Sequence, residues 1–294
     1  MTSFIGPYPL DDIYCGDSAV MLAALPDGCI DLTVTSPPYD DMDDDFNPIP
    51  ARGLRQYNGY TWDFKELARQ LYRVTKPGGV VVWIVGDPTI DGSESLASSL
   101  QKIYFRRVGF NLHDTMIYRK TKPPMNDRRY QDNFEYMFVL TRGRPQVFNP
   151  ILEKRKWKDG RKIKSYHREA DGNGFRSNTR QNAEMVIPVN VWEYNTGGGQ
   201  SASDDIAYSH PAIFPESLTR DHIISWSNPG DIVLDIFAGS GTTAKMSKLF
   251  HRHWLGFDIS QEYVNLARRR VAAAIAPDIR LVEQPAKPRQ DVLL

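Results

Sequence analysis

The sequence predicts an α/β fold built on one doubly wound, mostly parallel sheet. Three observations support this fold class. The run Val80–Val85 is continuously apolar, as in strands buried on both faces. Strand and helix patterns alternate from Asp12 to Thr141. A further strand, followed by a glycine-containing turn and a helix, begins at Asp231. The 294 residues, 41% hydrophobic and 24% charged, are typical of a globular protein with a large core.

The first elements lead to a rigid corner. Asp12–Tyr14 is typical of a short strand, and Ala19–Leu25 of a helix that Asp17 or Ser18 caps. The apolar strand Cys29–Thr35 follows and must stop where two consecutive prolines begin.

The next elements complete the first half of the sheet. Apolar residues at helical spacing predict a helix that begins at Asp63. They are Phe64, Leu67, Leu71 and Val74. The strand Val80–Val85 follows, and then a helix over Ser95–Val108. Two strands, Asp114–Tyr118 and Glu135–Thr141, flank a basic loop and predict an antiparallel hairpin at the end of the sheet.

The C-terminal part returns to the same alternation. Asp231–Asp235 is predicted as a strand, and a helix after it reaches about His251. A second strand, Trp254–Phe257, precedes an amphipathic helix over Gln261–Ala276. The last residues are rich in proline, lysine and arginine and predict a loose tail.

The stretch Thr35–Tyr39 has the properties of a reaction site. Its two prolines cannot donate backbone hydrogen bonds and hold φ at about −65°. Ser36 supplies a polar oxygen, and Tyr39 a ring that can stack on a flat ligand. This set fits a planar heterocycle that carries an amine. The alternative is a strand-ending turn beside a surface aromatic.

An acidic stretch, residues 40–46, follows the corner. Its five aspartates repel one another when packed, so we expect an exposed, mobile loop that could act as a lid. The glycine and the final glutamate of a calcium loop are missing at their offsets.

Cys15 and Cys29 lack metal-ligand spacing and are expected to be buried or half-buried thiols. We therefore predict no metal site.

Residues 145–205 differ in character, with little apolar periodicity. The formal net charge of the chain is zero, so any surface for nucleic acid must be local. A dense basic run interrupted by Trp157 predicts such a surface. Its predicted DNA-binding residues are Lys154, Arg155, Lys156, Lys158, Arg161, Lys162 and Lys164. The alternative is a solvated charge run without a ligand.

The strand–turn–helix unit near the C-terminus predicts a cofactor site. Gly239 and Gly241 let the backbone approach a ligand at a helix N-terminus. Asp258 lies 19 residues beyond Gly239, at the end of the next strand, where α/β proteins bind ribose hydroxyls. The third glycine of the dinucleotide fingerprint and the lysine of a phosphate loop are absent. A nucleoside cofactor without a pyrophosphate, S-adenosylmethionine, therefore fits best.

Two motifs closely resemble those of amino-specific DNA methyltransferases. They are Ser36-Pro37-Pro38-Tyr39 and Asp235-Ile236-Phe237-Ala238-Gly239-Ser240-Gly241-Thr242-Thr243. Their order, with the corner first and the glycines last, is similar to the circularly permuted beta group of that family. Shorter matches extend the resemblance over most of the chain. They are Gly16-Asp17, Lys76-Pro77-Gly78-Gly79 and His210-Pro211-Ala212-Ile213-Phe214-Pro215-Glu216.

The resemblance implies a permuted, Rossmann-like methyltransferase fold that uses S-adenosylmethionine. The catalytic residues it implies are Ser36, Pro37, Pro38 and Tyr39. The cofactor-binding residues it implies are Asp17, Phe214, Pro215, Asp235, Phe237, Ala238, Gly239, Ser240, Gly241, Thr242 and Asp258. Among these, Phe214 and Pro215 would flank the methionine end, and Asp258 would take the ribose. Helix capping explains Asp17 nearly as well.

The resemblance also implies a division of the chain and a set of partners. We expect a catalytic half over residues 1–144, a target-recognition insertion over 145–205, a cofactor-binding half over 206–280 and a flexible tail over 281–294. Double-stranded DNA is the expected partner, and a homodimer and a cognate restriction endonuclease are left open. No apolar run reaches the length of a membrane span, so we expect a cytoplasmic protein without membrane contact.

The expected reaction is methylation of an exocyclic amine on a flipped DNA base. A serine before the two prolines favours the 4-amino group of cytosine, with the 6-amino group of adenine as the alternative. A methyltransferase of RNA bases or protein amides is a rival, although those usually carry the glycine motif first. A non-catalytic DNA-binding module predicts a degraded cofactor pocket, whereas Gly239, Gly241 and Asp258 are present. A nicotinamide oxidoreductase would need the missing third glycine.

Overall fold

The computed structural model describes residues 3–49, 62–122, 129–154, 162–168, 175–181, 184–196, 199–210, 213 and 215–277. Residues 162–168 and 175–181 are described by their backbone alone. The chain divides into two compact units. The larger comprises Met1–Asn149 and Asn190–Gln284, and the smaller comprises Pro150–Val189 and Pro285–Leu294.

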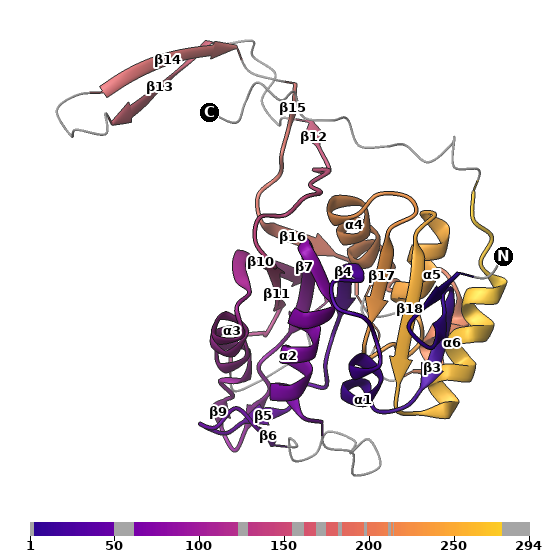
Figure 1. The fold of residues 1–294 in the computed structure, drawn as a ribbon. Helices are drawn as coiled ribbons and strands as arrows, with labels where there is room; N and C mark the ends of the chain where they lie inside the picture. Colours follow the sequence, from indigo (N-terminus) through magenta and orange to yellow (C-terminus); the bar gives the residue numbers. More distant parts are fainter. Residues whose placement is uncertain are drawn as a thin grey trace. The chain divides into compact units, whose positions relative to one another are not determined.

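An eight-stranded sheet organises the described part of the larger unit (Figure 1). Its strands, in spatial order, are β16 (Val191–Tyr194), β10 (Asn111–Lys120), β11 (Phe134–Thr141), β7 (Thr75–Val85), β4 (Ile30–Thr35), β17 (Ile232–Asp235), β18 (His253–Asp258) and β3 (Asp12–Cys15). Strand β11 runs antiparallel to both of its neighbours, and every other pair is parallel. The predicted mostly parallel sheet with an antiparallel hairpin is confirmed.

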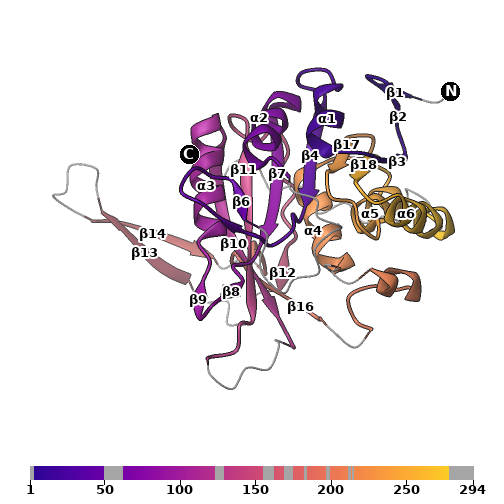
Figure 2. The ribbon, with the colours of Figure 1, turned by 90° about the horizontal axis from the view of Figure 1, so that it is seen from below.

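Helices cover both faces of this sheet (Figure 2). On one face lie α1 (Ser18–Ala23), α2 (Phe64–Val74) and α3 (Ala97–Val108). On the other lie α4 (Glu216–Trp226), α5 (Thr242–Leu249) and α6 (Gln261–Ala273). Local sequence explains three of these starts, because the side-chain oxygens of Asp17, Asp63 and Ser260 cap α1, α2 and α6.

Strand β7 lies between two apolar cores. Val81, Trp83 and Val85 pack in the core with α2 and α3. Val80, Val82 and Ile84 pack in the core with α4. Because successive side chains of a strand point to opposite faces, both sets must be apolar. This is why the strand appears in the sequence as one continuous apolar run.

Element boundaries differ from the prediction where tertiary contacts decide them. Strand β7 begins at Thr75, because Thr75 pairs with Ile30 of β4 and the backbone of Gly78 and Gly79 forms hydrogen bonds with Arg142. Helix α6 ends at Ala273, before the predicted Ala276, and Ala274 is extended; Pro277 has no amide that could donate to the Ala273 carbonyl in a longer helix. Strand β16 was not predicted and lies within the segment 145–205. Its four residues are held by parallel pairing with β10.

The acidic stretch is folded where the structure describes it. Strands β5 (Asp41–Met42) and β6 (Pro48–Ile49) form a small antiparallel hairpin, with Met42 and Phe46 buried. Asp43 accepts hydrogen bonds from the amides of Asp45 and Asn47, so its carboxylate stabilises the turn of the hairpin. The predicted exposure is confirmed for Asp44 and Asp45, but residues 41–49 form a hairpin with two buried side chains, which was not predicted. Residues 50–61 lie outside the described part.

Short elements complete the described fold. In the larger unit they are the pairs β1 (Phe4–Ile5) with β2 (Tyr8–Pro9) and β8 (Thr89–Ile90) with β9 (Ser93–Glu94), and the 3-10 helix η1 (Asp205–Ser209). In the smaller unit they are the antiparallel pairs β12 (Glu153–Lys154) with β15 (Met185–Val186) and β13 (Lys162–Arg168) with β14 (Phe175–Gln181). Among the helices that the structure describes, none is both long and apolar enough to span a bilayer.

The predicted DNA-binding residues belong to the smaller unit. Lys154 is exposed on β12, and Lys162 and Lys164 lie on β13. The remaining four lie outside the described residues: Arg155, Lys156, Lys158 and Arg161.

Candidate active site

The corner and the glycine motif meet at one edge of the sheet. Strands β4 and β17 are parallel neighbours, so Thr35 and Asp235 end them at the same edge. After β17 the chain proceeds to β18 on one side, and after β4 it proceeds to β7 on the other. Open α/β sheets bind ligands at such a point, where the strand order reverses. The Thr35 hydroxyl donates to Asp235 Oδ1 at 2.7 Å, which joins motifs 200 residues apart.

Ser36 and Tyr39 form the polar part of the corner. Pro37 is buried, whereas Ser36, Pro38 and Tyr39 are half-buried. The Ser36 hydroxyl donates to Tyr39 Oη at 3.3 Å, and the Tyr39 hydroxyl donates to Glu135 Oε2 at 2.6 Å. Burial, together with the charge of Glu135, raises the pKa of Tyr39 well above its ordinary value. Tyr39 therefore stays protonated and acts as a donor.

Asp235 is a buried carboxyl group at the centre of the edge. Its Oδ1 accepts hydrogen bonds from the Thr35 hydroxyl and from the Phe237 amide. The residue is only 3% exposed to solvent. Among the described residues, Oδ2 has no partner of good hydrogen-bond geometry, since the Thr243 hydroxyl donates to the Val34 carbonyl. Burial raises the pKa of Asp235 to about 6, although Thr243 lies close enough to offset part of the rise. A buried acceptor without such a partner at this edge is a candidate contact for a ligand's donor group.

The pKa of Asp235 makes a prediction for the variant Asp235→Asn. A carboxyl group whose pKa is raised by folding from 3.8 to about 6 costs stability once it ionises, by about 3 kcal/mol at neutral pH. The free energy of unfolding of the wild type, relative to the variant, should therefore fall by about that amount between about pH 4 and pH 7. Denaturant unfolding of the ligand-free proteins measures it.

The control for this prediction is Asp44→Asn, which changes an exposed aspartate in the β5–β6 hairpin. If the stability difference between wild type and Asp235→Asn were independent of pH, burial of the Asp235 charge would not be the cause.

The glycine motif makes a tight turn between β17 and α5. Gly241 has a left-handed φ of 78° and immediately precedes α5. A Cβ atom there would lie 2.7 Å from the Cβ of Ala267 in α6. Gly239 also has a left-handed φ, 49°, and a Cβ atom there would lie 3.1 Å from Nε2 of His210. Backbone conformation and close packing together therefore require glycine at both positions.

Asp258 links the end of β18 to the glycine turn. Its Oδ2 accepts from the Gly239 amide at 2.8 Å, and its Oδ1 accepts from the Ser260 amide at 2.9 Å. Burial raises the pKa of Asp258, and these two hydrogen bonds offset part of the rise. A carboxylate offers about four acceptor sites, so the group keeps capacity for ribose hydroxyls.

The other predicted cofactor residues surround this turn or precede helices. Asp17 follows β3 and caps α1, where its Oδ1 accepts from the Val20 amide at 3.0 Å. The neighbouring Gly16 amide donates to the Asp258 carbonyl at 2.9 Å, which brings Asp17 to the same edge. Phe237 is half-buried, and its ring centroid lies 5.4 Å from that of Trp62.

The remaining members of the predicted set fall into three groups. Ala238, Ser240 and Thr242 are buried in or directly after the turn. Pro215 immediately precedes α4. Phe214 lies outside the described residues.

A buried ionic cluster braces the glycine turn, and sequence reasoning missed it. Arg270 of α6, 1% exposed in its side chain, donates to the Ser240 carbonyl at 3.1 Å and to Thr242 Oγ1 at 2.9 Å. Arg270 also forms ion pairs with Asp204 and Glu216. Lys245 Nζ lies 2.6 Å from a carboxylate oxygen of each of the same two residues. The available signal was periodicity, because position 270 falls on the apolar face of α6.

The described residues contain no group of three or more histidine, cysteine or acidic side chains placed to hold a metal ion. Both cysteines are free thiols. Cys29 is half-buried as expected, whereas Cys15 is exposed at the end of β3.

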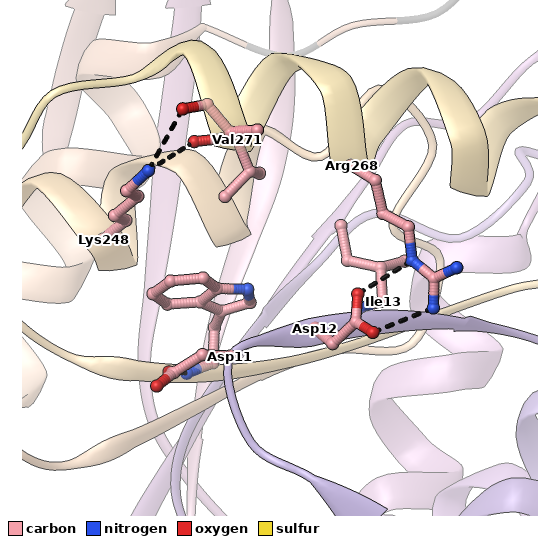
Figure 3. Close-up of a pocket in the computed structure, with 8 residues that line it drawn as sticks. Asp11, Asp12, Ile13, Lys248, Arg268 and Val271 are labelled. Carbon is pink, nitrogen blue, oxygen red and sulfur yellow. Dashed lines mark hydrogen bonds and ion pairs between the residues drawn. The ribbon is translucent and has the colours of Figure 1, made fainter. Parts of the chain in front are cut away.

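A surface pocket of about 490 Å³ lies elsewhere on the larger unit (Figure 3). It is located at the amino ends of β3 and β18, so it lies at the opposite end of these strands from Asp258. Its charged groups are already paired: Arg268 binds both carboxylate oxygens of Asp12, and Lys248 donates to the Val271 carbonyl at 2.8 Å. This pairing indicates a structural role, and the candidate site remains at the carboxyl edge.

The residues at the carboxyl edge fit S-adenosylmethionine. The spare acceptor capacity of Asp258 suits a ribose, and the buried, unpartnered Oδ2 of Asp235 suits a hydrogen-bond donor. The two glycines let the turn approach a ligand closely.

Comparison with known proteins identifies the family. Residues 30–269 match the N6/N4 family described as DNA methylase. The orphan methyltransferase M.BamHII of Bacillus amyloliquefaciens is 50% identical over 250 residues, which cover 83% of this chain and 89% of that protein. The type II methyltransferase M.BglII of Bacillus subtilis is 28% identical over 264 residues, which cover 88% and 68% of the two chains.

Solved structures share the fold. The PvuII DNA methyltransferase (cytosine-N4-specific) superposes with a TM-score of 0.63 at 21% identity, over 88% of this chain and 85% of its own. The M1.HpyAVI complex with S-adenosylmethionine superposes with a TM-score of 0.54 at 20% identity, over 88% of this chain and 98% of its own. The family match and the 50% identical relative show that the chain belongs to the N6/N4 DNA methylase family.

Proposed function

We propose that this DNA methylase modifies the 4-amino group of cytosine within a specific duplex sequence. The observation that carries the proposal is the hydrogen bond that the Ser36 hydroxyl donates to Tyr39 directly after β4. This bond directs the hydroxyl proton to Tyr39 and leaves the lone pairs of the Ser36 oxygen as acceptors for an amine. Serine at this position favours cytosine over the 6-amino group of adenine. The cytosine-N4 specificity of the PvuII enzyme, which shares the fold, supports the same choice.

The catalytic corner works by positioning in this proposal. The lone pair of an exocyclic amine is delocalised into the ring, which makes the amine a poor nucleophile. The base is flipped out of the duplex and stacked on Tyr39, and its N–H groups are accepted by Ser36 Oγ and the Pro37 carbonyl. Both bonds favour a pyramidal nitrogen with its lone pair aimed at the methyl donor. Transfer then needs orientation more than a covalent intermediate.

The cofactor half holds the methyl donor in this proposal. S-adenosylmethionine supplies an electrophilic methyl group: the amine lone pair forms the new C–N bond, sulfur keeps the electron pair of the broken bond, and the amine loses one proton to solvent. Asp258 accepts from the ribose hydroxyls, and the turn over residues 239–242 follows the ligand closely. Phe237, Asp235 and Asp17 complete the described part of the binding site, with Pro215 and Phe214 toward the methionine end.

The basic segment reads the DNA in this proposal. Residues 145–205 form the target-recognition insertion, and Lys154, Lys162 and Lys164 lie on its strands. Phosphate contacts by such lysines make affinity depend on salt. The chain as a whole has a net charge of zero, so these lysines would supply a local positive surface for duplex DNA.

Identification of the modified nucleoside tests the proposed function. The protein is incubated with duplex DNA and isotopically labelled S-adenosylmethionine, and the digested DNA is analysed by mass spectrometry. We expect label in N4-methylcytosine, with protein carrying the change Asp258→Ala as a control of weakened cofactor binding.

The other products distinguish the rival functions. Label in N6-methyladenine would assign the alternative base. Product on RNA or on a protein amide, with none on duplex DNA, would contradict the proposal.

A further inference from the structure

A chain of hydrogen bonds extends from Ser36 to residues outside both motifs. The Ser36 hydroxyl lies 3.3 Å from Tyr39 Oη, and Tyr39 Oη lies 2.6 Å from Glu135 Oε2. The other carboxylate oxygen of Glu135 pairs with Lys120 Nζ at 2.9 Å. Glu135 and Lys120 are largely buried, with side chains 14% and 17% exposed. Neither residue belongs to the catalytic or cofactor-binding set that the sequence predicts.

The fold brings these groups together from three strands. Lys120 ends β10, and Glu135 lies near the start of β11, its antiparallel partner, so both reach the edge where β4 ends. Gly86, which follows β7, leaves the space between them and the corner. A Cβ atom on Gly86 would lie 3.1 Å from Tyr39 Cε2 and 3.4 Å from Glu135 Cγ. The contact between Tyr39 and Glu135 is therefore built into the packing of the edge.

The chemistry of the end groups fixes the direction of every proton along this chain. A lysine ammonium can only donate, and an ionised carboxylate can only accept. Tyr39 must therefore donate to Glu135, and its oxygen is left to accept the proton of Ser36. Ser36 then has only lone pairs to offer to a third group. Without the carboxylate, both hydroxyl groups could rotate and reverse.

We propose that Glu135, anchored by Lys120, is a positioning residue that acts through Tyr39 to hold Ser36 as a hydrogen-bond acceptor for the substrate amine. The inference rests on the proposed function of the corner and adds two residues to it. Glu135 itself touches neither substrate nor cofactor in this assignment. Its effect on catalysis must pass through the Tyr39 hydroxyl.

A double-mutant cycle between Tyr39 and Glu135 tests the proposal. In Glu135→Gln, Lys120 takes the amide oxygen, and the amide NH₂ donates to Tyr39, which reverses the chain. We expect the single-turnover rate of methyl transfer to fall about tenfold, with the dissociation constant for S-adenosylmethionine unchanged. Tyr39→Phe keeps the ring and breaks the chain, so the rate should fall about threefold to tenfold. In the Tyr39→Phe background, Glu135→Gln should have no further effect.

The control and the opposing outcomes separate positioning from stability. Glu66→Gln removes an exposed ion pair on α2, Arg69 with Glu66, away from the corner and from the proposed DNA-reading segment, and should leave the rate unchanged. If Glu135→Gln slowed the reaction by the same factor with and without the Tyr39 hydroxyl, Glu135 would act by another route and the proposal would be wrong. If the wild type modified RNA or a protein amide in place of DNA, the proposed function would fail, and the cycle would be measured on that amine instead.

Discussion

Replacing Ser36 by alanine is expected to slow methyl transfer to DNA by about a hundredfold. The substitution removes the oxygen that we propose accepts the amine of the base, and it leaves the backbone of the corner, which Pro37 and Pro38 hold, unchanged. The proposed cofactor residues follow other strands, so affinity for S-adenosylmethionine should stay the same. A selective loss of rate is what a positioning role in the transition state requires.

Two measurements on Ser36→Ala separate chemistry from binding. Single-turnover methylation of duplex DNA gives the rate, and calorimetric titration gives the dissociation constant for the cofactor. Ser99→Ala, on the exposed side of α3, is the matched control and should behave as the wild type. An equal loss of rate and cofactor affinity, or no loss of either, would remove Ser36 from the proposed catalytic role.

The features that the sequence predicted correctly depend on local rules. Two prolines end β4 wherever the strand lies, and glycine is needed for the left-handed backbone at Gly241. The buried strand β7 shows its environment in its composition, because both of its faces are covered. These local signals were enough for the sheet, the corner and the glycine turn.

The features that were missed depend on distant partners. Glu135 is the first residue of a predicted strand, and the sequence does not show that it contacts Tyr39. The contact depends on the register of the β10–β11 hairpin and on the space that Gly86 leaves. Strand β16 has four residues and depends on pairing with β10. The hairpin in the acidic stretch was missed because Asp43 accepts turn hydrogen bonds from the amides of Asp45 and Asn47, an arrangement that charge counting does not reveal.

Arg270→Ala is expected to destabilise the folded protein by about 3 kcal/mol and to weaken binding of S-adenosylmethionine. The change leaves Lys245 as the cation that Asp204 and Glu216 share, and it removes the hydrogen bonds from Arg270 to Ser240 and Thr242 of the glycine turn. Burial alone would raise the pKa of Glu216, but the hydrogen bonds from Lys245 and Ser203 and the charges of Lys245 and Arg270 outweigh it and lower the pKa. A lowered carboxyl pKa stabilises the fold above the acid range, so the deficit should shrink as the pH falls below about 4.

Two further variants decide which contacts of Arg270 matter. Arg269→Ala changes the exposed neighbour on the same helix and should cost little. Arg270→Lys keeps the charge but lacks the planar fork that reaches Asp204, Glu216 and the turn at once. It should therefore recover part of the stability, measured by thermal unfolding, while cofactor affinity remains reduced. If the lysine variant recovered both properties, the charge of Arg270 alone would brace the site, and its hydrogen bonds to Ser240 and Thr242 would be dispensable.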